Sequence, residues 1–293
     1  MNFKDELKKY ANIINNEIEK KLIKDDVIEK KLNAATEYSL MAGGKRIRPV
    51  LMLATYNLFK QDIETVFPYA ISMEMIHNFS LIHDDLPGID NDDFRHGKPT
   101  NHKAFGEATA ILAGDLLLNK AYVVIAGELS KKSANIDLKI KAFNELTYGV
   151  ERMIIGEYVD TEFEGQKVSD DYLEYMHKNK TGALIKASIR IGAILAGASE
   201  EKIEKLSKYG ECIGLAFQIK DDILDVIGDV EELGKPVGND IEKHKSTFIT
   251  KYGLEESINR LNKITEDAIA IIGEFENGEF LKELAIYIRD RKK

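Results

Sequence analysis

The stretch that decides the fold is Leu81-Ile82-His83-Asp84-Asp85-Leu86-Pro87-Gly88-Ile89-Asp90-Asn91-Asp92-Asp93-Phe94-Arg95, which places five aspartates and an arginine directly after an apolar helical run. A second acidic group, Asp221-Asp222-Ile223-Leu224-Asp225, follows another apolar run far downstream. On a regular helix, with about 100° per residue, the three aspartates of the second group project from one face within an arc of about 100°. Like charges that lie so close repel each other, so we expect a cation between them.

The first acidic group needs a break in its helix. On an unbroken helix Asp90 would point roughly 240° away from Asp84, but Pro87-Gly88 can end or distort the helix and turn Asp90 back. Clusters built only of carboxylates suit hard cations, and Mg²⁺ binds through one or two carboxylates together with substrate phosphates. Solvated helix ends are the plain alternative, but apolar residues flank both groups and favour an interior cavity. A calcium loop is disfavoured because the alternating ligand spacing is missing.

The composition is that of an ordinary globular protein. Hydrophobic residues make up 44% and charged residues 31% of the 293 residues, and a chain of this length can bury a sizeable core. The formal net charge of −9 argues against nucleic acid as a partner. The single cysteine, Cys212, excludes an internal disulfide and fits a reducing cytoplasm. The N-terminal residues carry no apolar signal core, and no stretch approaches about 18 uncharged apolar residues, so we expect a cytoplasmic protein without a membrane span.

Apolar residues recur at helical spacing almost throughout, prolines number only five, and strand-like alternation is scarce. We therefore predict an all-α chain, and a single domain over residues 1–293 because no repeat or flexible linker interrupts it. Helices are expected over residues 3–22, 27–42, 50–59, 68–86, 106–129, 138–163, 170–198 (kinked at Thr181-Gly182), 201–227 and 247–290. Residues 88–102 are expected to form a polar loop, and Ser169 is expected to cap the helix that begins at residue 170. The segments 106–129 and 183–198 are apolar on most sides, which predicts that they lie at the centre of one bundle with a deep core.

Basic residues gather in the loops. Gly43-Gly44-Lys45-Arg46-Ile47-Arg48-Pro49 puts three cations and two glycines at a helix start, where backbone N–H groups and cationic side chains can bind an anion. A solvated basic turn is the alternative, and the glycine spacing excludes a P-loop. Cations also follow each acidic group, namely Arg95, His96 and Lys98, and then Lys235, Lys243, His244 and Lys245. Acids and bases around one cavity suit a metal-bridged diphosphate, so we expect a phosphate ester as substrate.

Put together, these motifs resemble those of the bacterial short-chain trans-prenyl diphosphate synthases, and among them the farnesyl diphosphate synthases most closely. The resemblance covers almost the whole chain. It is carried by the basic block 43–49, by residues 80–90 and 95–100, by Ala113-Gly114-Asp115, by Lys180-Thr181-Gly182, by residues 217–225 and by Leu233-Gly234-Lys235-Pro236. The first acidic group resembles the family's first Asp-rich motif in the form with two extra residues before the last Asp, and the second group resembles its partner motif.

The resemblance implies a polyprenyl synthetase domain, folded as an isoprenoid synthase-type helical bundle around a deep central cavity, with three Mg²⁺ ions and a homodimer. It also implies the reaction. Dimethylallyl or geranyl diphosphate loses diphosphate, the double bond of isopentenyl diphosphate attacks the allylic cation head to tail, and proton loss to the departing diphosphate follows. The expected end product is (E,E)-farnesyl diphosphate.

The resemblance assigns roles to individual residues as well. The metal positions are Asp84, Asp90 and Asp221, supported by Asp85, Asp222 and Asp225. Positions that hold the allylic diphosphate are Arg95, Lys235 and Lys245. Positions that bind isopentenyl diphosphate are Gly44, Lys45, Arg48, His77 and His96. The positions that face the allylic cation, which form the expected catalytic set with Arg95, are Lys180, Thr181 and Gln218.

Two positions depart from the family's pattern. His96 stands where the family usually has a second Arg, and a titrating His is not equivalent to a bidentate Arg, so isopentenyl diphosphate binding is expected to be weaker or more pH-dependent. Glu157 stands where the family commonly has Gln, three residues before Asp160. We hypothesise that Asp160 contacts metal-bound water, and normal Mg²⁺ dependence in an Asp160→Ala enzyme would contradict this.

Product length is expected to depend on Phe79, which lies five residues before Asp84 and so about 7.5 Å deeper along the helix. In the family a bulky aromatic there forms the floor of the chain pocket, and the neighbouring Ser80 is small, so the floor rests on one ring. Ordinary core packing is the plain alternative for Phe79. Other functions remain open: a geranyl or geranylgeranyl diphosphate synthase, a terpene cyclase, or a non-catalytic regulatory subunit. The basic block and both acidic motifs argue against the last two.

Overall fold

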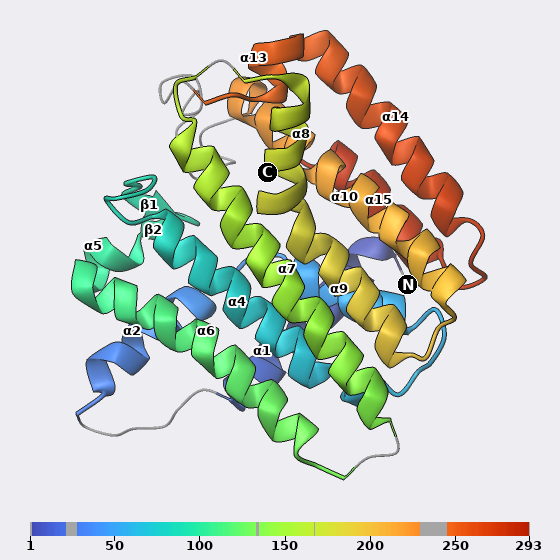
Figure 1. The fold of residues 1–293 in the computed structure, drawn as a ribbon, viewed down its shortest axis with the longest axis horizontal. Helices are drawn as coiled ribbons and strands as arrows, with labels where there is room; N and C mark the ends of the chain where they lie inside the picture. The colour runs from blue at the N-terminus through green and yellow to red at the C-terminus, as the bar shows by residue number, and fades with distance from the viewer. Residues whose placement is uncertain (1, 22–27, 133–134, 167, 229–244, 293) are drawn as a thin grey trace.

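The computed structural model describes residues 2–21, 28–132, 135–166, 168–228 and 245–292, and helices dominate these residues, which confirms the all-α class. The elements are α1 (Phe3–Glu19), α2 (Lys30–Leu40), α3 (Ile47–Tyr56), η1 (Ile63–Thr65), α4 (Phe67–Asp84), β1 (Phe94–Arg95), β2 (Lys98–Pro99), α5 (Asn101–Phe105), α6 (Glu107–Leu129), α7 (Ile136–Glu162), α8 (Asp170–Lys180), α9 (Gly182–Leu195), α10 (Glu200–Ile227), α13 (Phe248–Tyr252), α14 (Leu254–Ile272) and α15 (Glu279–Asp290). They pack as one bundle, with α4 against α6, α7 against α9, and α10 against both α9 and α14 (Figure 1).

The centre of the bundle is α9. Most of its residues are buried, and it packs against α3, α7 and α10, as its apolar sequence predicted. The predicted break at Thr181-Gly182 is confirmed, because α8 ends at Lys180 and α9 begins at Gly182. Ser169 caps α8, as predicted, by accepting from the Tyr172 N–H.

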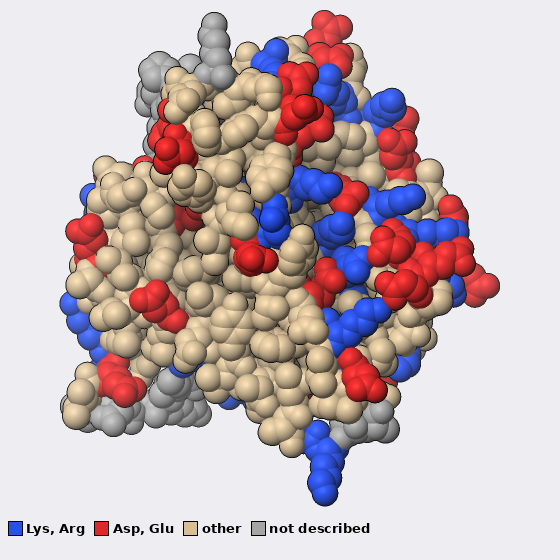
Figure 2. All heavy atoms as spheres, viewed as in Figure 1, with Lys and Arg blue, Asp and Glu red and all other residues tan. Residues whose placement is uncertain are grey.

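The prediction that residues 106–129 are central is wrong. α6 buries one face against α4, while Leu112 and Val123 on its other side are 55% and 59% exposed. Among the described residues α6 is the one helix long and apolar enough to cross a membrane, and a third of that stretch is buried. The front face of the molecule, where α6 and α7 run, is mostly uncharged, and charged residues gather towards the right-hand side (Figure 2). An apolar helix surface can therefore indicate a covering partner as well as a central position.

Residues 88–102 were predicted to be a polar loop, but they contain a small hairpin. β1 pairs antiparallel with β2, with Phe94 opposite Pro99 and Arg95 opposite Lys98. The connecting residues His96 and Gly97 have φ values of 52° and 73°. Two successive residues at positive φ are what a tight two-residue hairpin requires. The hairpin fixes where Arg95 and His96 stand relative to the end of α4.

Candidate active site

The loop after α4 brings the ends of the first acidic group together. α4 ends at Asp84, and the chain then reverses, so that the Asp90 N–H donates to the Asp84 carbonyl at 2.8 Å and the Asn91 N–H donates to the Leu86 carbonyl at 3.0 Å. Pro87-Gly88 lies inside this reversal. Asp90 thus returns to the end of α4, as the predicted break required.

Asp85, the second acid of this group, holds Arg95. Its carboxylate accepts from Arg95 Nε at 2.8 and 2.9 Å and from Arg95 Nη2 at 2.6 Å, and Asp85 is only 3% exposed. Burial raises the pKa of Asp85, and the Arg95 guanidinium opposes that shift. Because both oxygens are engaged, Asp85 fixes the hairpin arginine beside the acidic group.

Two lysines lie against carboxylates of α7, and one of them, Lys245, also contacts the first acidic group. Lys245 Nζ lies 2.8 Å from Asp90 and 3.5 Å from Asp160. Lys180 Nζ lies 2.6 Å from Asp160 and 2.9 Å from Glu157. The lysines predicted to hold or face the substrate therefore lie against carboxylates. If a metal binds these carboxylates, the same ammonium groups can bind an incoming anion.

The acidic residues fit a divalent metal together with a ligand. Burial, and then the neighbouring Glu157 carboxylate, raise the pKa of Asp84 to about 8, so its surroundings supply too little positive charge to favour its anion. Within the described residues, no three Asp, Glu, His or Cys side chains form a group that holds a metal by itself. The raised pKa of Asp84 agrees with a hard cation that completes its ligands from substrate phosphates.

The three aspartates of the second acidic group share a helix face but differ in how exposed their side chains are. Asp222 is 2% exposed and accepts from Gln218 Nε2 and from the Phe248 N–H at the start of α13, each at 2.8 Å. Asp225 is also buried, whereas the Asp221 side chain is 44% exposed. Asp222 therefore orients Gln218 and α13, while Asp221 is the accessible acid of the group.

Close glycine contacts bring Lys180 and Thr181 to these acids. A Cβ on Gly156 of α7 would lie 2.1 Å from Lys180 N, and a Cβ on Gly214 of α10 would lie 2.8 Å from Gly182 Cα. Only glycine permits such approaches at the junction of α8 and α9. Across this junction Thr181 Oγ1 donates to Gln218 Oε1 at 2.7 Å. The predicted cation-facing residues therefore lie together, beside Asp160 and Glu157.

The basic loop divides its cations between the interior and the site. Arg46 is 4% exposed and pairs with Glu74 at 2.6 Å, so it is a buried structural residue. Lys45 lies over the Tyr287 ring, and Arg48 Nη1 donates to His77 Nε2 at 3.2 Å. Positive φ at Gly43, Gly44 and Arg46 shapes the turn that separates them.

Arg48 lies in the electrostatic field of both acidic groups. Burial lowers the pKa of its guanidinium, and the carboxylates of Glu74, Asp221 and Asp84 act against that shift, so acids of α4 and α10 both lie within electrostatic reach. Arg48 Nε is buried and has no hydrogen-bond partner. A buried donor without an acceptor suits an anionic ligand.

Two histidines of the site, His77 and His96, lie close to arginines. Burial, and next Arg48 and Arg95, lower the pKa of His77 well below its ordinary value. Burial, and next Arg95 and Arg46, lower the pKa of His96. A diphosphate would supply the missing negative charge at this position.

Comparison with known proteins agrees with this arrangement. A family model described as polyprenyl synthetase matches residues 29–284. The chain belongs to the polyprenyl synthetase family. It is 43% identical over 289 residues to a farnesyl diphosphate synthase of Micrococcus luteus (97% of this chain, 96% of the relative) and 42% identical over 279 residues to a geranylgeranyl diphosphate synthase of Cyanophora paradoxa (91% and 92%). The crystal structure of a geranyltransferase from Helicobacter pylori, complexed with magnesium and isoprenyl diphosphate, superposes with a TM-score of 0.82 at 28% identity (95% and 97%).

This polyprenyl synthetase is a short-chain prenyl diphosphate synthase, a prenyltransferase of isoprenoid biosynthesis. The two residues expected to set chain length, Phe79 and Ser80, lie about one turn before the acids at the end of α4. Phe79 is 8% exposed and its ring meets the His83 ring edge-on, with centroids 4.8 Å apart. Ser80 Oγ donates to the His77 carbonyl at 2.9 Å, so its hydroxyl is engaged within the helix.

Sequence reasoning missed Arg291 of the synthase. Its Nη2 lies 2.6 Å from Asp221 Oδ1 and donates to the Phe217 carbonyl at 3.1 Å, and its guanidinium lies 4.3 Å from the centre of the Phe217 ring. Nothing local distinguishes Arg291 from the other cations that end the chain, because the contact joins residues 70 positions apart. One predicted site residue, Lys235, lies outside the described residues.

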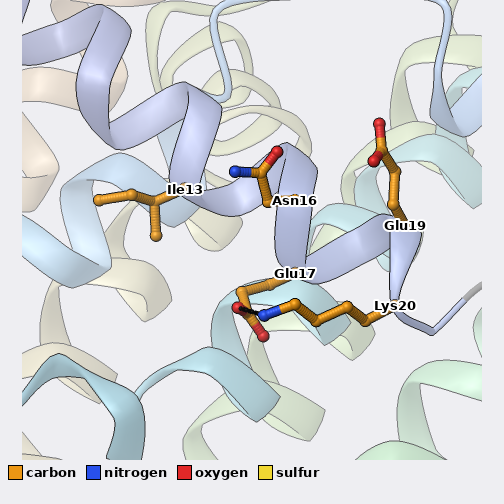
Figure 3. A pocket seen from close by; sticks show the side chains of 5 residues that line it. All are labelled: Ile13, Asn16, Glu17, Glu19 and Lys20. Carbon is orange, nitrogen blue, oxygen red and sulfur yellow. Dashed lines mark hydrogen bonds and ion pairs between the residues drawn. The ribbon is translucent and has the colours of Figure 1, made fainter.

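A hollow of about 700 Å³ lies away from all of these residues, along the last turns of α1 (Figure 3). Its lining consists of Ile13, Asn16, Glu17, Glu19 and Lys20, which come from a single helix. In Figure 3 Glu17 and Lys20 pair with each other. Polar groups from different elements do not converge here, in contrast to the acidic groups and the basic loop, which form the candidate active site.

Proposed function

We propose that this synthase makes (E,E)-farnesyl diphosphate from isopentenyl diphosphate and dimethylallyl or geranyl diphosphate, with Mg²⁺ bound by Asp84, Asp90 and Asp221. The observation that carries the proposal is the position of Arg48, whose buried, unpartnered Nε lies within electrostatic reach of both acidic groups. Two anionic substrates that must react with each other need such a meeting point of acids and bases. The relatives that bear farnesyl names add to the support.

The reaction would proceed in three steps: ionisation, condensation and proton loss. The C1–O bond of the allylic diphosphate breaks, and its electron pair leaves with diphosphate. The double bond of isopentenyl diphosphate then supplies the pair that forms the new bond from its C4 to the allylic C1. Loss of a proton from C2 of that unit to the departing diphosphate restores a double bond. Asp84, Asp90 and Asp221 would hold Mg²⁺, which when bound would supply positive charge that stabilises the leaving group.

The chain's own residues would bind and shield the reactants. Arg95, oriented by Asp85, and Lys245 would hold oxygens of the allylic diphosphate, while Lys45, Arg48 and His77 would hold isopentenyl diphosphate. The oxygens of Thr181 and Gln218, joined by their hydrogen bond, would face the cation with their negative ends. Exclusion of water by these side chains would protect the cation from hydrolysis.

Product analysis tests the proposal. The purified protein is incubated with isopentenyl diphosphate and either dimethylallyl or geranyl diphosphate, with Mg²⁺ or with a chelator. A C15 diphosphate that forms only with Mg²⁺ is expected. A C20 product would favour the alternative of a geranylgeranyl diphosphate synthase, which the similarity to the Cyanophora paradoxa enzyme supports. A C10 end product would indicate a geranyl synthase, and no condensation would indicate a regulatory subunit.

We also propose a homodimer through the exposed face of α6 and α7. Apolar side chains on this face include Ile111, Leu112, Val123, Ile140, Tyr148, Ile154 and Tyr158, which are between 41% and 62% exposed. A continuous apolar face of this kind marks an interaction surface, and a second copy would bury it. The cytoplasmic location expected from the single cysteine stays a prediction.

Light scattering of the purified protein tests the dimer. Leu112→Glu is expected to convert a dimer to monomer at micromolar protein, because it places a charge in an apolar interface. Ile258→Glu is the matched control, since Ile258 is 37% exposed on α14, away from the face. A wild-type protein of monomer mass would contradict the proposal.

A further inference from the structure

We propose that His83 is a specificity-determining positioning residue, which holds the Phe79 ring in place and so sets product length together with it. This inference rests on the proposed function, in which Phe79 is the floor of the chain pocket. His83 has no assigned role there, although it stands directly before Asp84.

The first observation is the contact between the two rings. Phe79 and His83 lie four residues apart on α4 and therefore on the same helix face. Their centroids are 4.8 Å apart and their planes are inclined by 70°, an edge-on arrangement that restricts both rings. A growing chain that reaches Phe79 must displace its ring, and the His83 ring closes one direction in which Phe79 can turn.

The second observation is that His83 is itself anchored to another helix. Its Nε2–H donates to the Ile111 carbonyl of α6 at 3.0 Å, and the Asp115 carboxylate lies 3.9 Å from the same nitrogen. Near the other end of α4 the Ser72 hydroxyl donates to the Ala121 carbonyl of α6 at 2.8 Å. These two hydrogen bonds fix the register of the antiparallel helices α4 and α6, and Phe79 lies between the two bonded positions on α4.

The third observation is the space that α6 leaves for the His83 ring. A Cβ on Gly114 would lie 2.2 Å from His83 Nε2 and 2.4 Å from its Cδ2. Gly114 is helical and its φ is not positive, so backbone conformation does not call for glycine here. The ring of His83 does call for it, because any side chain at 114 would push that ring out of position.

The test compares the ratio of C20 to C15 product at excess isopentenyl diphosphate. His83→Ala removes the edge contact and is expected to raise the ratio roughly 2- to 12-fold, the change that an aromatic pair corresponds to. Gly114→Ala is expected to raise it as well, because it displaces His83. His83→Phe keeps a ring beside Phe79 and is expected to stay near the wild-type ratio. The ratio is insensitive to general damage, since both products need the same acids and metal.

A double variant tests whether Gly114 acts through His83. In a His83→Ala background Gly114→Ala meets no ring, so the double variant is expected to match His83→Ala alone. Gly127→Ala, on the same helix with nothing within 4 Å, is the matched control and is expected to leave the ratio unchanged. Circular dichroism confirms that each variant is folded.

Phe79→Ala in the same assay separates the two proposals. If Phe79→Ala lengthens the product while His83→Ala and Gly114→Ala leave the ratio at the wild-type value, the proposed role of His83 is wrong. The proposed role of Phe79 as pocket floor is then retained. If Phe79→Ala leaves the product unchanged, the proposed floor itself is wrong, and the inference about His83 fails with it.

Discussion

Replacement of Arg46 tests whether this arginine of the basic loop stabilises the fold, while its neighbour Lys45 binds substrate. Arg46 donates to Asn15 Oδ1 at 2.9 Å, to Glu74 Oε1 at 2.6 Å and to the Leu40 carbonyl at 2.6 Å, so it joins α1, α2 and α4. Its side chain and that of Glu74 are 2% and 4% exposed. Removal of one partner of such a buried pair leaves an uncompensated charge and costs about 3–5 kcal/mol. At about 2 °C per kcal/mol for a chain of this size, Arg46→Ala is expected to lower Tm by roughly 6–10 °C.

Thermal unfolding followed by circular dichroism measures this effect, and Lys45→Ala in the same loop is the control. Lys45→Ala is expected to leave Tm nearly unchanged and to raise KM for isopentenyl diphosphate. Arg46→Met combined with Glu74→Leu removes both charges and is expected to regain much of the loss. A Tm change for Arg46→Ala no larger than for Lys45→Ala would refute the assignment of Arg46 to the interior.

Three further predictions concern the site. Asp85→Asn weakens a bidentate charged pair with Arg95, so KM for the allylic diphosphate is expected to rise roughly 10-fold in steady-state assays, and an unchanged KM would contradict the role of Asp85. Gly156→Ala forces Lys180 away from α7 and is expected to lower kcat about 100-fold, with Gly127→Ala unaffected. Burial and then Arg95 hold the pKa of His96 below its ordinary value of 6.5 in the free protein, and bound diphosphate would raise it, so KM for isopentenyl diphosphate is expected to rise with pH from an onset below 6.5. His96→Arg should flatten this profile, and a flat wild-type profile would argue against proton uptake at His96.

Local sequence patterns predicted the helical elements well, because a helix is specified by contacts three and four residues apart. The kink at Thr181-Gly182, the cap at Ser169 and the reversal at Pro87-Gly88 all follow from residues within a few positions of each feature. The hairpin at 94–99 was missed, because its signal is a single His-Gly pair at positive φ without alternating strands beside it.

The sequence by itself determined which residue types gather at the site, since the two acidic groups and the basic loop can be identified from their spacing. It could not distinguish acids or cations of the same type within one motif. Arg46 and Lys45 are neighbours, yet partners on three other helices draw Arg46 into the interior. Asp222 and Asp221 are neighbours too, yet Gln218 and the start of α13 donate hydrogen bonds to Asp222 and not to Asp221. The outer face of α6 is a further case, because an apolar helix has the same sequence whether its own chain or a second copy covers it. Burial and long-range partners decide these roles, and both exist only once the helices have packed.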